Sequence, residues 1–189
     1  MSRAVEITRL DLSFAELRKM AKKEKSPLVV RRMLAIAPSD PEANGVLADT
    51  LASRQAFADA VPHYRAYLAA HGSNGNEWTG LGIALVATGK PAEAVEAFRN
   101  AVAANASNAQ FRINLARALL DQGDSGAALE EARRAATAVP DEPAAHDVLA
   151  RAFATRGMLD FARREFQRAL QLDPQYAPSV EGLKQLAGR

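Results

Sequence analysis

Residues 75–108 decide the fold and read GNEWTGLGIALVATGKPAEAVEAFRNAVAANASN. Two sets of apolar residues recur in this stretch at helical spacing: Leu81, Ala84 and Leu85, then Ala94, Phe98, Ala101 and Val102. Such spacing places each set on one face of an amphipathic helix. Between the sets, Gly89 supplies the left-handed residue that ends a helix, and Pro91 suits the first turn of the next one. The stretch therefore predicts two helices joined by a tight turn.

The same pattern recurs along the chain at a constant interval, called here the repeat period. A leucine marks each repeat, at Leu47, Leu81, Leu115 and Leu149, and the period is the step from one of these leucines to the next. Thirteen residues after each leucine stands an alanine, at Ala60, Ala94, Ala128 and Ala162. The residue next to each leucine is small, which lets the two helices of a repeat approach closely. Because neither helix can bury its apolar face alone, the repeats are expected to stack on one another.

These positions resemble the tetratricopeptide repeat (TPR) family. One unit meets the family pattern closely, with Trp78, Leu81, Gly82, Leu85, Ala94, Phe98 and Ala101, and Pro140 and Pro174 fill the closing proline of two others. Leu85 departs from the pattern, which has tyrosine there. The resemblance implies an all-α fold, a right-handed α-solenoid of helix-turn-helix repeats with a C-terminal capping helix.

The predicted organisation is one continuous solenoid domain. A degenerate helical pair is expected first, then four repeats and a capping helix: residues 1–40, 41–74, 75–108, 109–142, 143–176 and 177–189. The repeat at 41–74 should be the least regular, because Pro62 falls inside its second helix and Gln55 replaces the turn glycine. Either that helix starts late, near Asp59, or the proline kinks it.

Composition and charge narrow the function classes. The chain has no cysteine, which excludes disulfides and thiolate chemistry. No apolar run approaches the roughly 20 residues needed to span a bilayer. Residues 1–10 are charged and lack an apolar signal core, so we expect a cytoplasmic protein, or a periplasmic one if a leader was removed. Residues 1–40 carry nine Lys/Arg against five Asp/Glu. That excess fits contact with an acidic protein, phosphate or a membrane surface. The alternative is that these cations favour the macrodipole near a helix C-terminus and keep the end of the stack soluble.

The sequence offers no recognisable catalytic or metal-binding constellation. His63, His71 and His146 lack the three- or four-residue spacing that places two ligands on one helical face. His146 occupies the position of Trp78, which favours a partly buried structural histidine. The glycines lack the Lys-Ser/Thr of a phosphate loop, and the basic cluster has too few aromatic residues for nucleic-acid binding. We therefore predict no enzyme, no cofactor, no metal and no nucleic-acid partner.

The family resemblance also implies a partner-binding groove, lined by the first helix of each pair. The implied lining residues are Asp49, Asn76, Thr79, Ile83, Gln110, Ile113, Asn114, Arg117, Asp147 and Arg151. Arg117 and Arg151 stand one repeat apart and are candidates to grip a carboxylate or backbone carbonyls. The alternative is that these are solvated helix residues and that Arg117 pairs with Asp147 or Asp121.

The predicted function is a protein-protein interaction scaffold or adaptor that binds a peptide or protein segment in this groove. The family resemblance also implies that the scaffold takes part in the assembly of a bacterial secretion, pilus or envelope complex. Chaperone-binding members use a clamp of lysines, asparagines and an arginine, and of the aligned residues Thr79, Ile83, Asn114, Ala144 and Val148 only Asn114 fits it. The alternatives are a module that self-assembles through its terminal helices and an accessory domain of a larger enzyme.

Overall fold

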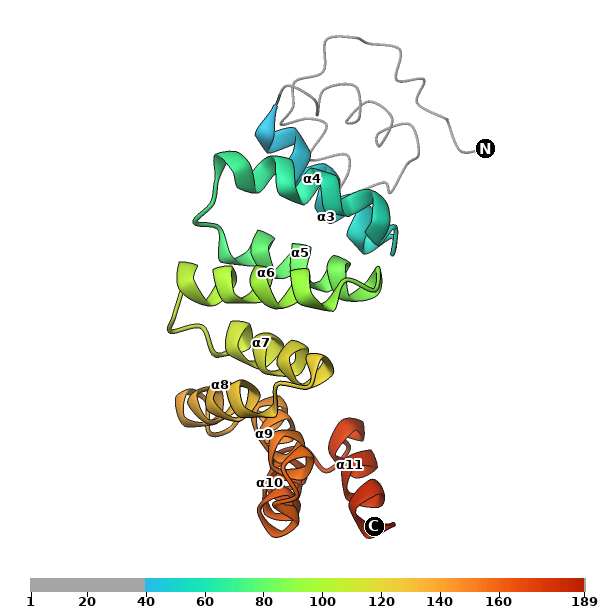
Figure 1. Ribbon diagram of the computed structural model, residues 1–189, viewed down its shortest axis with the longest axis vertical. Coiled ribbons are helices and arrows are strands. Elements are labelled where there is room, and N and C mark those ends of the chain that lie inside the picture. The colour runs from blue at the N-terminus through green and yellow to red at the C-terminus, as the bar shows by residue number, and fades with distance from the viewer. Residues whose placement is uncertain (1–39, 189) are drawn as a thin grey trace, which may run out of the picture. The chain divides into compact units, whose positions relative to one another are not determined.

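The computed structural model describes residues 40–188, and these residues form nine α-helices and no strand (Figure 1). In chain order the helices are α3 (Pro41–Ser53), α4 (Phe57–Ala70), α5 (Gly75–Ala87), α6 (Pro91–Ala104), α7 (Ala109–Gln122), α8 (Ser125–Ala138), α9 (Pro143–Thr155), α10 (Leu159–Leu172) and α11 (Ala177–Ala187). The all-α prediction is confirmed. The predicted helical pair over residues 1–40 lies outside the described residues, apart from Asp40.

The chain divides into two compact units between Ala70 and His71, and each is described by itself. Within the second unit the helix starts follow the repeat period of the sequence. The first helices of the pairs start at positions 75, 109, 143 and 177, and the second helices start at positions 91, 125 and 159. Each step equals the step from Leu81 to Leu115. The helix-turn-helix pattern read from the apolar spacing is therefore present in the backbone.

The turns inside the pairs adopt the left-handed conformation that their glycines predict. Gly89, Gly123 and Gly157 have φ angles of 73°, 89° and 74°. Gln55 stands at the equivalent place in the first unit and is held at φ 61°, the one positive φ of a non-glycine residue among those described. A side chain raises the energy of this conformation, so the α3–α4 turn is strained where the other three are not.

The described part of the first unit is the α3–α4 pair. Asp40 caps α3, since its Oδ1 accepts the backbone N–H of Glu42 at 2.9 Å. Helix α4 starts at Phe57 and contains Pro62 in its second turn. Of the two alternatives for this helix, the late start near Asp59 is therefore wrong, and Pro62 lies inside the helix. Pro62 has no N–H, so it cannot donate to the carbonyl four residues earlier, and the neighbouring turns carry the helix through this gap.

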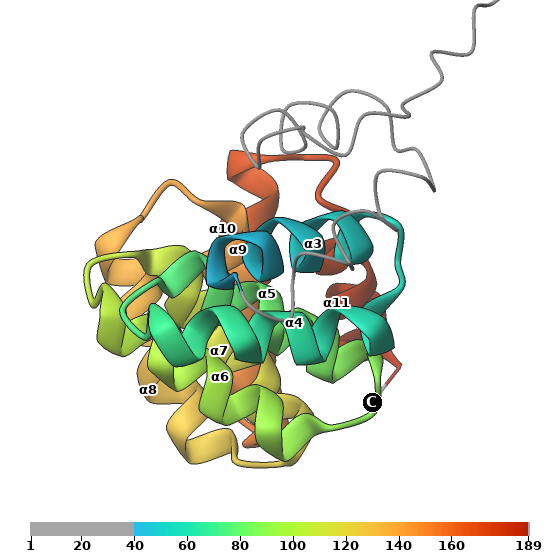
Figure 2. The same cartoon turned by 90° about the horizontal axis from the view of Figure 1, so that it is seen from above.

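In the second unit the two helices of each pair pack on each other, and successive pairs pack on one another (Figures 1 and 2). Small residues make the close approach within a pair, as predicted. A Cβ added to Gly82 would come within 2.6 to 2.8 Å of three ring carbons of Phe98. Helix α11 closes the stack by packing on α9 and α10, and its Leu186 joins the core cluster that contains Phe166. This confirms the predicted capping helix.

A side-chain hydrogen bond recurs with the repeat period at positions 78, 112 and 146. Trp78 Nε1, Arg112 Nη2 and His146 Nε2 each bond the backbone carbonyl six residues earlier, at 2.7, 2.8 and 2.9 Å. His146 is 9% exposed and also places Nδ1 2.7 Å from Glu165 Oε2. The prediction of a buried structural histidine is therefore confirmed. Both ring nitrogens of His146 therefore have a partner within the chain.

Candidate functional site

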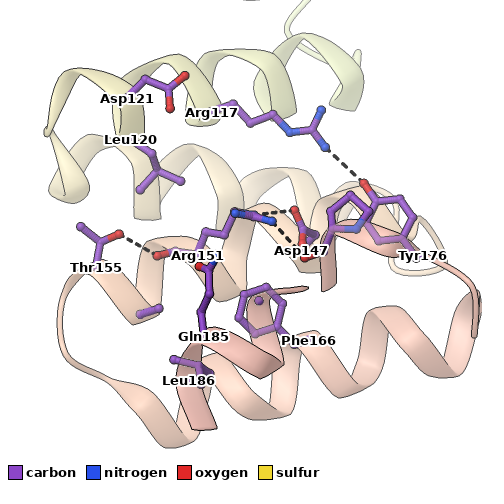
Figure 3. A pocket seen from close by; sticks show the side chains of 13 residues that line it. Arg117, Leu120, Asp121, Asp147, Arg151, Thr155, Phe166, Tyr176, Gln185 and Leu186 are labelled. Atoms are coloured by element: carbon purple, nitrogen blue, oxygen red, sulfur yellow. Dashed lines mark hydrogen bonds and ion pairs between the residues drawn. The ribbon is translucent and has the colours of Figure 1, made fainter. Parts of the chain in front are cut away.

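Two adjoining pockets open on the second unit. The polar pocket has a volume of about 600 Å³ and is lined by Arg117, Leu120, Asp121, Asp147, Arg151, Ala154, Thr155, Phe166, Tyr176, Pro178, Gly182, Gln185 and Leu186 (Figure 3). The apolar pocket has a volume of about 310 Å³ and is lined by Ile83, Val86, Ala87, Phe98, Asn114, Arg117, Ala118 and Asp121. Arg117 and Asp121 belong to both, so the pockets meet along one turn of α7.

The repeat period explains why these residues share one surface. Ile83, Arg117, Arg151 and Gln185 follow one another at intervals of one repeat period, on α5, α7, α9 and α11. Equivalent positions on successive first helices face the same side of a stacked array. The surface therefore changes along the stack from apolar at α5 to polar at α9 and α11.

Arg151 is held in place by contacts with its own chain. Its Nε donates to Asp147 Oδ2 at 2.9 Å, and its Nη2 donates to the carbonyl of Pro178 at 3.0 Å (Figure 3). The other carboxylate oxygen of Asp147 accepts the hydroxyl of Ser179 at 3.0 Å. Asp147 is 1% exposed, and a buried charge is stable only when it is paired and hydrogen-bonded in this way. Arg151 therefore balances the Asp147 charge and anchors the start of α11.

Arg117 is bound much more loosely. Its Nη2 donates to the phenol oxygen of Tyr176 at 3.3 Å, and Figure 3 shows the side chain reaching toward Tyr176 and away from Asp121. No carboxylate of residues 40–188 forms an ion pair with it. The expected alternative, in which Arg117 pairs with Asp147 or Asp121, is therefore wrong. Burial raises the pKa of the Tyr176 phenol, although the Arg117 guanidinium beside it favours the ionised form.

The apolar pocket exposes two large aliphatic side chains. Ile83 is 48% exposed and Val86 is 45% exposed. Among the described residues only Phe161 is another large hydrophobic residue with comparable exposure. Both aliphatic residues line one concavity, and clustered exposed apolar surface of this kind marks interaction sites more often than scattered residues do.

Ile113 does not line the surface, although it was predicted to do so. Its side chain is fully buried in the core cluster with Ala116, Ala145 and Val148. The reason is that α7 packs against α5, α6, α8 and α9, which widens the apolar face that it must bury. The apolar character of Ile113 therefore belongs to the core and does not contribute to partner binding.

The other nine predicted residues divide into five that line these two pockets and four that do not. Five line the pockets: Ile83, Asn114, Arg117, Asp147 and Arg151. Asn76 lies in the first turn of α5, and the hydroxyl of Thr79 donates to the carbonyl of Gly75 at 2.9 Å. Gln110 donates to Asn114 Oδ1 at 3.2 Å. Asp49 lies on α3 in the first unit, where its carboxylate accepts the hydroxyl of Tyr64 at 3.1 Å.

Sequence reasoning missed several lining residues that helical geometry points to. Val86 lies three residues after Ile83, and Leu120 and Asp121 lie three and four residues after Arg117, so each shares a face with a predicted residue. Gln185 lies one repeat period after Arg151. Tyr176 and Pro178 carry no such signal, because they reach the pocket only through the fold of the segment that leads into α11.

Residues 40–188 show neither a metal cluster nor a membrane span. No three His, Asp or Glu side chains of this part gather closely enough to hold a metal ion. None of its helices combines the length and apolar character that crossing a bilayer requires.

Paired helices that recur with one period and a lined surface on the first helices define a helical-repeat protein. The family model described as Tetratricopeptide repeat matches residues 27–75, 79–143 and 114–177. The chain therefore belongs to the tetratricopeptide repeat family, as its sequence pattern predicted. Repeats of this family form protein-interaction scaffolds, bind protein or peptide partners and are generally not catalytic.

Solved structures support the same fold. One similar structure is "YrrB: a TPR protein with an unusual peptide-binding site", with 18% identity, a TM-score of 0.75, and coverage of 90% of this chain and 84% of that one. A structure of MamA is similar at 19% identity with a TM-score of 0.76, covering 88% of this chain and 98% of that one. At these identities the likeness shows the fold alone. No curated protein sequence matches the chain.

Proposed function

We propose that this chain is a non-catalytic scaffold that binds an extended peptide or protein segment along the joined polar and apolar pockets. The observation that carries the proposal is the junction itself. Arg117 lies between an apolar concavity and a polar one, on a surface made by successive first helices. Small-molecule sites are usually enclosed and mostly apolar, whereas a surface that runs across several helices suits an elongated ligand.

The ion pair of the polar pocket, Asp147 and Arg151, is unsuited to acid-base catalysis. Both carboxylate oxygens of Asp147 already accept hydrogen bonds, and Arg151 is engaged with Asp147 and Pro178. A general base must have a free oxygen or nitrogen within hydrogen-bond reach of its substrate. Asn114 lines the apolar pocket, and its side-chain NH2 can donate to a peptide main chain while its Oδ1 accepts from Gln110.

The wider setting of this scaffold is proposed from the family resemblance alone. We place it in the assembly of a bacterial secretion, pilus or envelope complex, with a protein of that complex as the partner. The alternative of self-assembly through the C-terminal helix is less favoured. The apolar residue Leu186 is buried in the core of its own chain, and no large hydrophobic residue of α11 is among the exposed ones.

A steric block tests the proposed surface. Ala87 is exposed and lines the apolar pocket, so Ala87→Trp fills the pocket without disturbing the core. Ala103 is exposed on α6 outside both pockets, so Ala103→Trp is the matched control. Random displayed peptides are selected on the full chain, and the enriched peptides are measured on all three proteins. We expect Ala87→Trp to abolish binding and Ala103→Trp to preserve it. Equal binding to Ala87→Trp would place the site elsewhere.

A further inference from the structure

We propose that the bound segment carries an acidic side chain and a large apolar side chain on the same face, two positions apart in an extended strand. The carboxylate is bound by Arg117, and the apolar side chain enters the pocket beside Ile83 and Val86. This inference rests on the proposed function and adds the chemistry of the partner.

The charge of Arg117 is what selects the acidic group. Arg151 is matched by the buried carboxylate of Asp147, while Arg117 is held by one 3.3 Å hydrogen bond to Tyr176 and has no ion pair among the described residues. A guanidinium binds a carboxylate through two parallel N–H donors, and Arg117 uses only Nη2 within its own chain. The remaining donors of Arg117 are therefore available to a ligand.

Asp121 sets a limit on this recognition. It lines both pockets with Arg117, one helical turn further along α7, and it is exposed. An exposed charge is weakened by solvent and salt, so it does not cancel the attraction of Arg117 at hydrogen-bond distance. It does repel a second acid next to the first. The ligand should therefore carry a single acidic residue at this place and not an acidic run.

The apolar part of the ligand follows from the exposure of Ile83 and Val86. Each exposes nearly half of its side chain within a concavity of about 310 Å³. Covering such surface contributes about 25 cal/mol per Å² of apolar area removed from water. A leucine-sized or phenylalanine-sized side chain gains this energy, whereas a polar one loses its hydration without a matching partner.

The spacing between the acidic and the apolar residue of the ligand follows from the position of Arg117, which lines both pockets. This residue lines the apolar pocket as well as the polar one, so the acidic and apolar groups bind within one side chain's reach of each other. Extended residues rise about 3.3 Å each and alternate between two faces. Residues two apart therefore lie on one face about 7 Å from each other, which fits neighbouring pockets. Residues one apart point to opposite faces and cannot fill both.

The acid is assigned to a side chain inside the segment and not to a chain end. Arg117 lies at the junction of the two pockets, and each pocket continues away from it. A segment that crosses Arg117 therefore has a surface to follow on both sides, whereas a terminal carboxylate bound there would leave one pocket unused.

The test uses peptides selected on the full chain and a matched synthetic series. The series contains the parent, a Glu→Gln or Asp→Asn peptide, an apolar→Ser peptide, a peptide with the acid moved by one position, and a C-terminally amidated parent. Fluorescence anisotropy gives the Kd of each peptide for the wild type, Arg117→Gln and Ile83→Ser. Arg163→Gln and Phe161→Ser serve as exposed controls, because neither residue lines the two pockets.

We expect the wild type to bind the parent about tenfold more tightly than the Glu→Gln or Asp→Asn peptide, as a charge-assisted hydrogen bond implies. The Arg117→Gln protein should lose that preference. Arg117→Gln in the protein and the acid-to-amide change in the peptide should then together weaken binding no more than either change alone. Ile83→Ser should remove the preference for the apolar side chain in the same way. Amidation of the terminus and both control substitutions should leave Kd unchanged.

Several results would overturn the inference. Selected peptides without an acid, a shifted-acid peptide that binds as well as the parent, or an Arg117→Gln protein that still prefers the acid would each exclude it. Loss of binding on amidation would assign the carboxylate to the chain end. In all of these cases the Ala87→Trp block would still hold, so the proposed surface would survive. Binding that ignores Ala87→Trp would reject the surface itself.

Discussion

The hydroxyl of Ser179 donates to Asp147 Oδ1 at 3.0 Å, and this bond joins α9 to α11 across 32 residues of sequence. Both partners are almost completely buried, at 1% exposure for Asp147 and 0% for Ser179. The repeat period places Asp147 where α7 has the buried Ile113, so a charged residue occupies a core position of the repeat. Its carboxylate is tolerated there because Ser179 and Arg151 satisfy both oxygens.

Replacing Asp147 should therefore destabilise the C-terminal end of the second unit. Asp147→Ala removes the acceptor of Arg151 Nε and of the buried Ser179 hydroxyl, at a cost of about 2–3 kcal/mol. Ser179→Ala removes one donor and should cost about 1 kcal/mol. Urea denaturation measures both. Asp160→Ala, at an exposed position on α10, is the control and should change the unfolding free energy by less than about 0.5 kcal/mol.

Substitutions of the two arginines in the polar pocket should change the unfolding free energy by different amounts. Arg151→Gln breaks the ion pair with Asp147 and the bond to Pro178, so we expect a loss of about 1–2 kcal/mol. Arg117→Gln removes one long hydrogen bond and should change stability by less than about 0.5 kcal/mol. The same denaturation curves decide this. Equal losses would show that Arg117 has a structural role similar to that of Arg151.

The strained turn of the first unit predicts a stabilising substitution. Gln55 adopts φ 61°, a conformation that costs a non-glycine residue about 1 kcal/mol. Gln55→Gly should raise the unfolding free energy of the α3–α4 pair by about 0.5–1 kcal/mol, and Gly89→Ala should lower that of the α5–α6 pair by about the same amount. Thermal and urea unfolding followed by circular dichroism measure these shifts. A Gln55→Gly protein no more stable than the wild type would show that the strain is compensated locally.

Two glycines inside helices should respond to alanine in opposite directions. A Cβ on Gly126, in α8, would meet only ordinary van der Waals neighbours, the nearest being Asp124 Oδ1 at 3.6 Å, so Gly126→Ala should stabilise the protein by about 0.5–1 kcal/mol. A Cβ on Gly82 would lie 2.6 Å from Phe98 Cε1, so Gly82→Ala should cost about 1–3 kcal/mol. Paired unfolding curves test the sign of each change. Stabilisation by Gly82→Ala would mean that α5 and α6 can separate without loss.

His63 should make the first unit sensitive to mild acid. Burial lowers the pKa of its imidazole below 6.5, although Asp59 opposes this, and Nδ1 lies 2.8 Å from Asn44 Oδ1. The unfolded chain therefore binds the proton more readily, and stability is full above pH 6.5 and is lost as pH falls through the folded pKa. Because His63 is only partly buried, solvent screening keeps this contribution small. The difference between wild type and His63→Gln, measured from about pH 7.5 to 5, isolates this contribution from the carboxylates.

The features predicted correctly from the sequence are those fixed by local spacing. The constant step of the helices follows from the leucines and alanines, and the left-handed turns follow from Gly89, Gly123 and Gly157. A glycine is needed only by its own turn, and a leucine at helical spacing is needed by the helix that carries it. Neither depends on distant parts of the chain.

The site was predicted only in part, because burial and pairing depend on distant segments. Arg117 and Arg151 occupy equivalent repeat positions and look alike in the sequence, yet Pro178 engages one and Tyr176 the other. The predicted lining role of Ile113 was wrong because α9 covers that part of α7. These differences in burial and hydrogen-bond partners arise when the next helix packs on the repeat. The sequence of a single repeat therefore does not predict them.

The recurring bond of Trp78, Arg112 and His146 has a consequence for rearranging the repeats. An indole, a guanidinium and an imidazole all serve there, so the position requires a donor of suitable reach and no particular ring. The partner nineteen residues later changes with the donor, because Glu131 faces Arg112 and Glu165 faces His146, while Ala97 stands at that place after Trp78. A chimeric array built from this chain must therefore be cut between hairpins, since exchanging one helix alone would separate Glu131 from Arg112 and Glu165 from His146.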